Sequence, residues 1–511
     1  EVLETNENNF KNPKPVNQKV SDLIITKLKQ SDPELTTPDP TKLLTISELR
    51  HELGIPLILA RKLIVWGLIG AVQMTDGSLR ISATKIEEAK KFLKSPWKRT
   101  RLYIKALGPG LITGASDDDP GGIGTYSAVG AKYGFGLLWM AAWLLPMMIA
   151  IQETCARIGI VTNRGLAHVL KKHFNKKIVF GIVTALIIAN IINIGADIGA
   201  MAASLKLIVP VNFILATFLF TAIIIAIELT IPYYTYVKVL KWLTLSVFAY
   251  IVTGILIKPD WILIFREVII PDIQFQREYI FAMIAVFGTT ITPYLFFWQT
   301  SEEVEENRLA KEDTSKFTPY RLRSRIARMR TDVNSGMILA NLVFFFIIIT
   351  CAQVLFKNGI TEIETAEQAA EALRPFAGNY AFLLFALGII GTGLLAVPIL
   401  AGSGAYALAE LMNWKEGLDR KFTKAKGFYL VISASIVAGL LINFIGINPL
   451  TALYYSAWLN GIISIPLLFV IMLIGNDKRI MGRETHPKWV KVFGWGAVAF
   501  AVLSVITLIF I

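Results

Sequence analysis

The sequence predicts an all-α, polytopic membrane protein with eleven transmembrane helices, and three observations support this prediction. The chain has 511 residues, of which 54% are hydrophobic, and its mean hydropathy of +0.55 is high for a soluble chain of this length. The apolar residues fall into runs of roughly 18 to 25, the length that crosses a bilayer as a helix. Basic residues gather in alternate loops between these runs.

Two polar segments are expected before the first span. Residues 1–42 contain Pro, Asn and Lys and predict a flexible N-terminal arm. Residues 43–98 predict a soluble, winged-helix-like module. Because this whole region is polar, no cleavable signal peptide is expected. The module is indicated by a helix cap, a turn, a second helix, a hairpin and a last amphipathic helix, at Thr45–Glu48, Gly54–Pro56, Leu57–Leu68, Gly70–Ser82 and Ala83–Leu93.

The winged-helix pattern raises the question of DNA binding, as does the net charge of +13. The candidate recognition helix Leu57–Leu68 offers only Arg61 and Lys62, whereas base readout needs several Arg, Asn or Gln side chains. The positive-inside rule explains most of the net charge. We therefore expect no nucleic-acid partner, with DNA binding by residues 43–98 as the alternative, and the sequence indicates no protein partner.

Residues 99–511 form the expected transmembrane domain. The basic segments are 94–105, 164–177, 308–330, 415–426 and 478–491. They place the N-terminus and the soluble module in the cytoplasm and the C-terminus outside, in a multi-pass protein of the cell membrane. The spans are expected at roughly 104–133, 136–161, 178–204, 211–231, 236–257, 279–305, 333–356, 378–412, 427–445, 449–474 and 490–511.

The first span is interrupted by Asp117-Asp118-Asp119-Pro120-Gly121-Gly122. Proline removes a backbone donor and clashes with the preceding turn, and glycine weakens a helix, so the helix should unwind here. In hydrocarbon such a break is tolerated only inside the protein or beside a water-filled cavity. Carboxylates and free carbonyls together form an oxygen site for cations. The alternative is a surface loop with solvated Asp side chains.

A second break is expected at Thr289-Thr290-Ile291-Thr292-Pro293-Tyr294 in span 6. Taken alone it would be a simple proline kink. Its position changes this, because spans 1–5 and 6–10 become two halves that each begin with a broken helix. With an odd number of spans in each half, the second half is inverted in the membrane. Inverted repeats with paired broken helices bind substrate at the midplane, which favours a transporter.

Several motifs resemble the Nramp divalent-metal transporters over about residues 100–511. Gly108-Pro109-Gly110 and Asp119-Pro120-Gly121-Gly122 are similar to the first-helix Asp-Pro-Gly-Asn signature of that family, and Thr292-Pro293-Tyr294 stands in place of Met-Pro-His. Ala196–Gly199 and Gly391–Glu410 are also similar to it. The subgroup that the chain resembles most is the prokaryotic Nramp-related magnesium transporters, which implies a prokaryotic inner membrane. The resemblance implies a LeuT-like fold with 5+5 inverted repeats plus one helix. It also implies a metal site whose candidate residues are Asp119, Gly122, Thr289 (through its carbonyl), Thr292, Tyr294 and Asp118.

Departures from the family motif indicate the ion. Thr292 replaces a methionine, so the site loses its soft sulfur and becomes all oxygen, which suits Mg²⁺, Ca²⁺ and Mn²⁺. Gly122 replaces the Asn ligand and leaves room for water, which Mg²⁺ releases reluctantly. Asp118 is expected to add charge directly or through water, whereas Asp117 is expected in an outer vestibule or in solvent. We therefore predict uptake of Mg²⁺ and Mn²⁺ as transported substrates, with no cofactor.

Other departures bear on proton coupling. Where the family motif has His, this chain has Tyr294, and where the family has a second His, this chain has Gln299. An acidic family position shortly after Asp197 is occupied here by Ala200. None of these three residues is a proton carrier at physiological pH. Transport is therefore predicted to be uncoupled from protons, although Asp119 and Asp197 remain possible carriers. The alternatives are a proton-coupled Mn²⁺/Fe²⁺ importer and a membrane metal sensor that signals through the N-terminal module. Because no catalytic dyad or phosphate loop is found, an enzyme is not expected.

Four glutamates at the cytoplasmic end of span 6, Glu302, Glu303, Glu305 and Glu306, have two interpretations. They form an acidic exit vestibule that attracts cations, or they are solvated side chains that face the basic loop 6–7. In span 2, Glu153 and Arg157 are four residues apart and predict an ion pair within one helix.

Overall fold

A computed structural model describes residues 43–53, 71–73, 79–82, 108–231, 235, 248–310, 314 and 317–511. The chain divides into two compact units. One unit holds residues 1–105 with 319–328, and the other holds residues 106–318 with 329–511.

The described part of the N-terminal unit is a small antiparallel sheet with one helix. Strands β1 (Leu43–Leu44), β2 (Ala71–Gln73) and β3 (Leu79–Ser82) lie in the order β1-β3-β2. Helix α2 (Ile46–Leu53) begins with reciprocal bonds, because Glu48 Oε2 accepts from the Thr45 N–H at 2.6 Å and Thr45 Oγ1 accepts from the Glu48 N–H at 3.2 Å. The predicted cap and hairpin are thus present, and β1 was not predicted. The predicted helices at 57–68 and 83–93 lie outside the described residues.

The second unit is a bundle of long helices at almost all the positions that hydropathy predicts. Among the described residues, eight helices are long and apolar enough to cross a membrane, when α15 and α16 are taken together. Helix α21 is shorter, the first span is split into two pieces, and residues 236–247 are not described, so the number of eleven spans stays a prediction. The helices are α6 (Pro109–Asp117), α7 (Pro120–Tyr133), α8 (Trp139–Thr162), α10 (Lys176–Leu205), α11 (Phe213–Thr230), α13 (Phe248–Leu256), α15 (Arg277–Thr290), α16 (Pro293–Leu309), α17 (Pro319–Val354), α20 (Ala381–Met412), α21 (Lys426–Ile442), α22 (Pro449–Asn476) and α24 (Lys488–Phe510).

Short helices that hydropathy did not predict lie between the spans. Helix α14 begins at Asp260, whose carboxylate accepts from the N–H groups of Ile262 and Leu263 at 3.0 and 3.2 Å. The others are α9 (Leu166–His173), α18 (Ala366–Glu371), α19 (Arg374–Ala377) and α23 (Lys478–Met481), with 3₁₀ turns at Phe356–Asn358, Gly378–Tyr380 and Phe422–Lys424.

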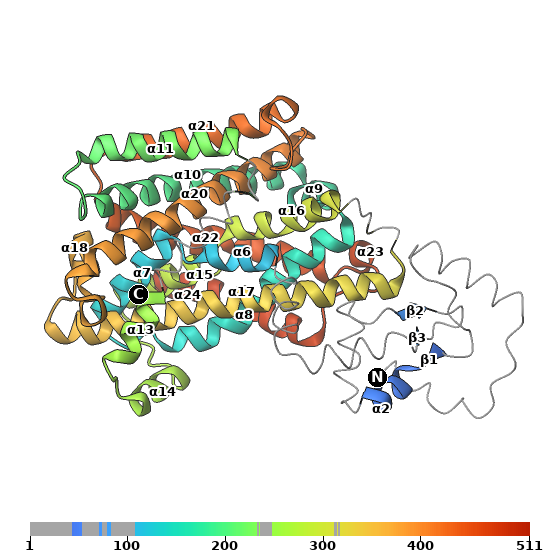
Figure 1. Cartoon of the computed structure of the whole chain (residues 1–511), viewed down its shortest axis with the longest axis horizontal. Coiled ribbons are helices and arrows are strands. Elements are labelled where there is room, and N and C mark those ends of the chain that lie inside the picture. The colour runs from blue at the N-terminus through green and yellow to red at the C-terminus, as the bar shows by residue number, and fades with distance from the viewer. Residues whose placement is uncertain are drawn as a thin grey trace, which may run out of the picture. The chain divides into compact units, whose positions relative to one another are not determined.

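The broken helices occupy the middle of the bundle. Helices α7, α15 and α22 contact one another there, whereas α11 and α21 lie side by side at the edge (Figure 1). The apolar stretch of Arg277–Leu309 is 94% buried inside the protein, but that of Phe213–Thr230 is only 33% buried, so the latter faces lipid. At the centre, a Cβ on Gly288 of α15 would overlap the backbone of Gly461 of α22. The two helices therefore meet backbone to backbone, a contact that small residues allow in membrane bundles.

The predicted ion pair in span 2 is present and has a third member. Arg157 Nη2 donates to Glu153 Oε1, and the Arg330 Nε of α17 donates to the same oxygen at 2.8 Å. Glu153 and Arg157 are both buried. Because a buried charge is tolerated only when it is paired, this cluster ties α8 to α17.

Candidate metal site

The first helix break lies between α6 and α7 and has Asp119 at its centre. Helix α7 begins with Pro120, a residue suited to the first helical position because its missing N–H has no partner there. Asp119 is the N-cap, and its Oδ1 accepts from the Gly122 N–H at 2.6 Å. Proline also cannot donate to the carbonyl four residues earlier, so the break frees the Ser116 oxygen.

The second break repeats this arrangement in span 6. Helix α15 ends at Thr290, and α16 begins with Pro293 at its first position. Thr292 is the N-cap residue in backbone position, but its hydroxyl makes no capping bond. By the same reasoning Pro293 frees the carbonyl of Thr289, the group that the sequence indicates as a ligand.

The two breaks meet, and two tyrosines join them. The Tyr294 hydroxyl from α16 lies 3.0 Å from the Ser116 carbonyl oxygen and 3.3 Å from Asp119 Oδ2. In the other direction, the Tyr126 hydroxyl from α7 lies 2.9 Å from Thr290 Oγ1 on α15. Each broken helix thus supplies a phenol to the other. The carbonyl freed by Pro120 accepts from Tyr294, the residue that follows the second proline, so this bond joins the two breaks.

Carboxylates gather at this point without contact with solvent. Asp117, Asp118 and Asp119 are 2%, 6% and 4% exposed, so the expectation that Asp117 is solvated or in a vestibule is wrong. Asp197 of α10 lies beside Gly121, and its charge interacts with that of Asp119. Carboxylates withdrawn from water cost several kcal/mol each unless they are paired. This arrangement therefore favours a bound cation.

Unpartnered oxygen atoms support the same conclusion. Among the described residues, the buried Asp117 Oδ1, Asp197 Oδ2 and Thr292 Oγ1 have no hydrogen-bond partner. Buried polar groups in proteins are almost always bonded, so these three oxygen atoms are free to accept from or coordinate a further group. In the same part of the chain, no group of three or more His, Cys, Asp or Glu side chains is arranged to hold a metal ion. An ion here would complete its shell with carbonyls, hydroxyls and water, which suits transient binding.

Of the six predicted residues, three are in direct contact. Asp119 bonds to the backbone of Gly122 and lies within reach of the Tyr294 hydroxyl. A Cβ at Gly122 would lie 3.0 Å from the Asp117 carbonyl oxygen, which is a tight contact. The other three, Asp118, Thr289 and Thr292, are buried in the two breaks.

Sequence reasoning missed two groups at the site. The Ser116 carbonyl was predictable from its position four residues before Pro120. Asp197 was noted only as a possible proton carrier, and a carboxylate in an apolar span is by itself a signal of function. Its proximity to Asp119 follows from the packing of α10 against α7.

The acidic end of span 6 is not a solvated helix end. Glu302, Glu303 and Glu305 are at most 1% exposed. Gln299 Nε2 donates to Glu303 Oε1 at 3.2 Å, and Gln299 Oε1 accepts from the Thr113 hydroxyl of α6 at 2.6 Å. The solvated interpretation is therefore wrong for these three glutamates.

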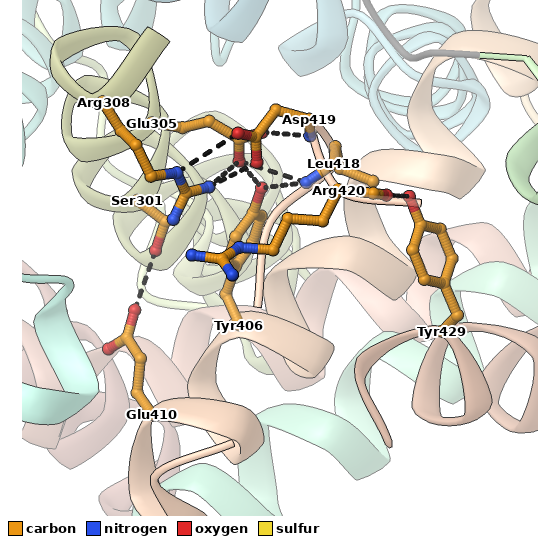
Figure 2. Close-up of polar contacts among 9 residues, drawn as sticks. All are labelled: Ser301, Glu305, Arg308, Tyr406, Glu410, Leu418, Asp419, Arg420 and Tyr429. Carbon is orange, nitrogen blue, oxygen red and sulfur yellow. Dashed lines mark hydrogen bonds and ion pairs between the residues drawn. The ribbon is translucent and has the colours of Figure 1, made fainter. Parts of the chain in front are cut away.

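Glu305 fastens the segment after α20 to the end of α16 (Figure 2). Its carboxylate accepts from the Tyr406 hydroxyl, from the Leu418 N–H at 3.2 Å and from the Asp419 N–H. Arg308 pairs with Asp419 at 2.6 Å. Because both carboxylate oxygens of Glu305 accept hydrogen bonds within the protein, Glu305 has a structural role here and is not available as a ligand for a transported cation.

Comparisons with known proteins identify the family of this chain. Residues 110–511 match the family model Nramp, natural resistance-associated macrophage protein-like. The divalent metal cation transporter MntH of Klebsiella pneumoniae (strain 342) is 25% identical over 413 residues, which cover 79% of this chain and 93% of that protein. The MntH protein of Bacillus subtilis (strain 168) is 26% identical over 400 residues, 77% of this chain and 89% of that protein.

A solved structure shares the fold. The Eremococcus coleocola manganese transporter, in complex with an aromatic bis-isothiourea substituted compound, has a TM-score of 0.63 at 16% identity and covers 81% of this chain and 87% of its own. The predicted all-helical, LeuT-like membrane fold is thereby confirmed. The N-terminal module lies outside the family match and stays a prediction.

Proposed function

Because this chain belongs to the Nramp family, we propose that it carries divalent metal ions across a membrane and that Mg²⁺ and Mn²⁺ are its substrates. The curated relatives are transporters and not enzymes by name. Assignment to the magnesium-transporting subgroup is part of the proposal, as is the metal-binding role of the six candidate residues.

One observation carries this proposal. Two helices broken by proline meet at Asp119, and the groups around the break are oxygen atoms of carboxylates, hydroxyls and freed carbonyls. Hard dications prefer such ligands. In the proposed site Asp119 binds the ion, Tyr294 orients Asp119, and the Thr289 carbonyl and the Thr292 hydroxyl face the ion from the second break.

The ion that fits this set keeps part of its water. Gly122 offers no side-chain ligand, and Asp118 and Asp117 add negative charge close by. A site with few direct ligands and much charge favours an ion that exchanges its waters reluctantly, which is Mg²⁺. Mn²⁺ has similar ligand preferences and is the second substrate.

The proposed transport needs no proton gradient. An inside-negative potential of 100 mV supplies about 4.6 kcal/mol for a divalent ion. Tyr294 lies beside the break, and Gln299 lies farther along α16. These two residues support uncoupled transport, since neither side chain changes charge near pH 7. We propose a prokaryotic inner membrane with the N-terminus in the cytoplasm and the C-terminus outside, from the distribution of basic loops.

A proton-coupled Mn²⁺ or Fe²⁺ importer is the second candidate, and two observations favour it. Asp197 is a buried carboxylate in the membrane-spanning helix α10, and such residues often belong to proton pathways. Met201, one turn later on α10, lies beside Gly393, which also borders Pro120. A thioether near the break would favour softer ions.

Uptake into proteoliposomes tests the proposal and separates the two candidates. Mg²⁺ and Mn²⁺ influx is measured with internal pH, for wild type and for Asp119→Asn. Asp260→Asn is the matched control, because Asp260 also caps a helix N-terminus but lies outside the breaks. We expect influx at constant pH, lost in Asp119→Asn and kept in Asp260→Asn. Acidification in step with influx would establish the second candidate, and full influx in Asp119→Asn would refute the site.

A further inference from the structure

The N-terminus of α6 is capped by a residue from another helix. Gly108 at the N-cap has no side chain, and the first turn of α6 holds no acidic residue. Its free N–H groups point instead at Asp332 of α17. The Asp332 carboxylate accepts from Gly108 at 2.7 Å, from Gly110 at 2.7 Å and from Leu111 at 3.1 Å. One buried carboxylate thus binds the first turn of the half-helix that leads to Asp119.

Helix α6 also touches α17 without intervening side chains. A Cβ on Gly110 would lie 2.6 Å from the Val333 nitrogen, and one on Gly114 would overlap the backbone of Gly336. On the side of α16, Thr113 donates to Gln299 at 2.6 Å. Helix α6 is therefore held in a slot between α17 and α16, and the Asp332 carboxylate is a charged group that bonds directly to its first turn.

The same half-helix is separated from α7 by a hinge. Asp118 has φ −85° and ψ 44°, which is outside helical geometry, and α7 starts afresh with its own cap at Asp119. A few residues between two rigid segments are what a hinge requires. If the ion at Asp119 is to leave on the side of the α6 N-terminus, α6 must tilt out of the slot, and the three bonds to Asp332 must break.

We propose that Asp332 is a latch that holds α6 closed and thereby sets how often the metal site opens on the side where α6 begins. The biological purpose of this latch depends on the proposed transport function, but the experiment that tests the latch does not. Asp332 is a positioning residue, because it acts on the ion only through α6. Its substitution is expected to move the balance between closed and open states and to leave the chemistry of the site unchanged.

Thiol labelling of the purified, full-length protein in proteoliposomes measures this balance. Ser116, buried on α6 near the breaks, is replaced by Cys in a background in which Cys155 and Cys351 are Ser. Asp332→Asn keeps the shape of the side chain but removes the charge that strengthens three hydrogen bonds. The labelling rate with a membrane-impermeant reagent, added on the side of the α6 N-terminus, is expected to rise roughly tenfold. Asp332→Glu is expected to restore part of the protection.

Asp477→Asn is the matched control, because Asp477 also accepts from a helix N–H, that of Arg479 at 2.8 Å, but lies away from α6. It should label like wild type. Equal labelling of wild type and Asp332→Asn would overturn the proposal, as would a rise on the opposite face only. If labelling rises but no metal is carried by the wild type, the latch stands and the transport function falls.

A measurement on the wild type covers the case in which Asp332→Asn does not fold. Hydrogen exchange of peptides that span residues 108–117 is followed with and without Mg²⁺. The latch predicts slow exchange at Gly108, Gly110 and Leu111, and a change of this protection on Mg²⁺ binding that peptides of α24 do not share. Fast exchange of the three amides in both conditions would refute it.

Discussion

Removal of one hydroxyl tests how the two breaks cooperate. In Tyr294→Phe the ring stays in place, but the oxygen that lies 3.0 Å from the Ser116 carbonyl and 3.3 Å from Asp119 Oδ2 is lost. A hydroxyl has one proton, so it serves one of these acceptors at a time, and the bond to Asp119 is the longer. We therefore take a free-energy loss just below the range for charged hydrogen bonds, about 1 to 1.4 kcal/mol, which corresponds to a roughly five- to tenfold rise in the Kd of Mg²⁺.

Isothermal titration of Mg²⁺ into the purified protein measures this Kd, and uptake gives the matching change in KM. Tyr429→Phe is the control, because its hydroxyl donates to a carbonyl as well, that of Arg420 at 2.8 Å, but lies on α21 and outside the breaks. It should leave the Kd within twofold of wild type. Tighter binding in Tyr294→Phe would show that the phenol blocks Asp119 and does not orient it, and an unchanged Kd would show that it does neither.

Three further predictions concern the ion and acid stability. Gly122→Asn adds an amide ligand at a position where the new Cβ would lie 3.0 Å from the Asp117 carbonyl oxygen. The amide should displace water from the ion and weaken Mg²⁺ uptake relative to Mn²⁺ uptake. An unchanged ratio of Mg²⁺ to Mn²⁺ uptake would count against a hydrated ion. Met201→Leu should leave Mn²⁺ uptake unchanged, whereas a selective loss of Mn²⁺ would place sulfur in the site. Burial, with smaller contributions from Arg157 and Lys491, lowers the pKa of His486 to about 3. The unfolded chain then binds a proton below pH 6.5 and the folded protein does not, so stability should fall by up to about 1.4 kcal/mol per pH unit from 6.5 towards 3. Thermal melts of His486→Gln should lack this component, and identical acid profiles would contradict the assignment.

The breaks were predictable because their cause is local. Pro120 and Pro293 each interrupt an apolar run, and proline acts on the residue four before it whatever the rest of the chain does. Hydropathy likewise located the long helices, because bilayer thickness fixes their length. The all-oxygen character of the site stays a prediction, which rests on Thr292 and Gly122 standing where the resembled family motif has Met and Asn.

Contacts between distant residues were not predictable. Asp332 binds Gly108 across 224 positions of sequence, and nothing in a run of apolar residues indicates which carboxylate will meet which helix end. The burial of Asp117 depended on the helices that surround the break. The bonds of Glu305 to the backbone of Leu418 and Asp419 formed for the same reason, and a patch of glutamates looks identical in sequence whether it lines a vestibule or fastens a loop.

The carbonyls at positions 116 and 289 have a consequence for how such a protein changes its preference for ions. They lack a helical N–H donor because proline follows four residues later, and no replacement of Ser116 or Thr289 by another amino acid removes a backbone oxygen. In the proposed site these two backbone oxygens would persist through any substitution at their own positions, so a change of cargo would act through the side chains at 118, 119, 122, 292 and 294. A library restricted to those five codons would test how far the ion preference of this scaffold can be changed.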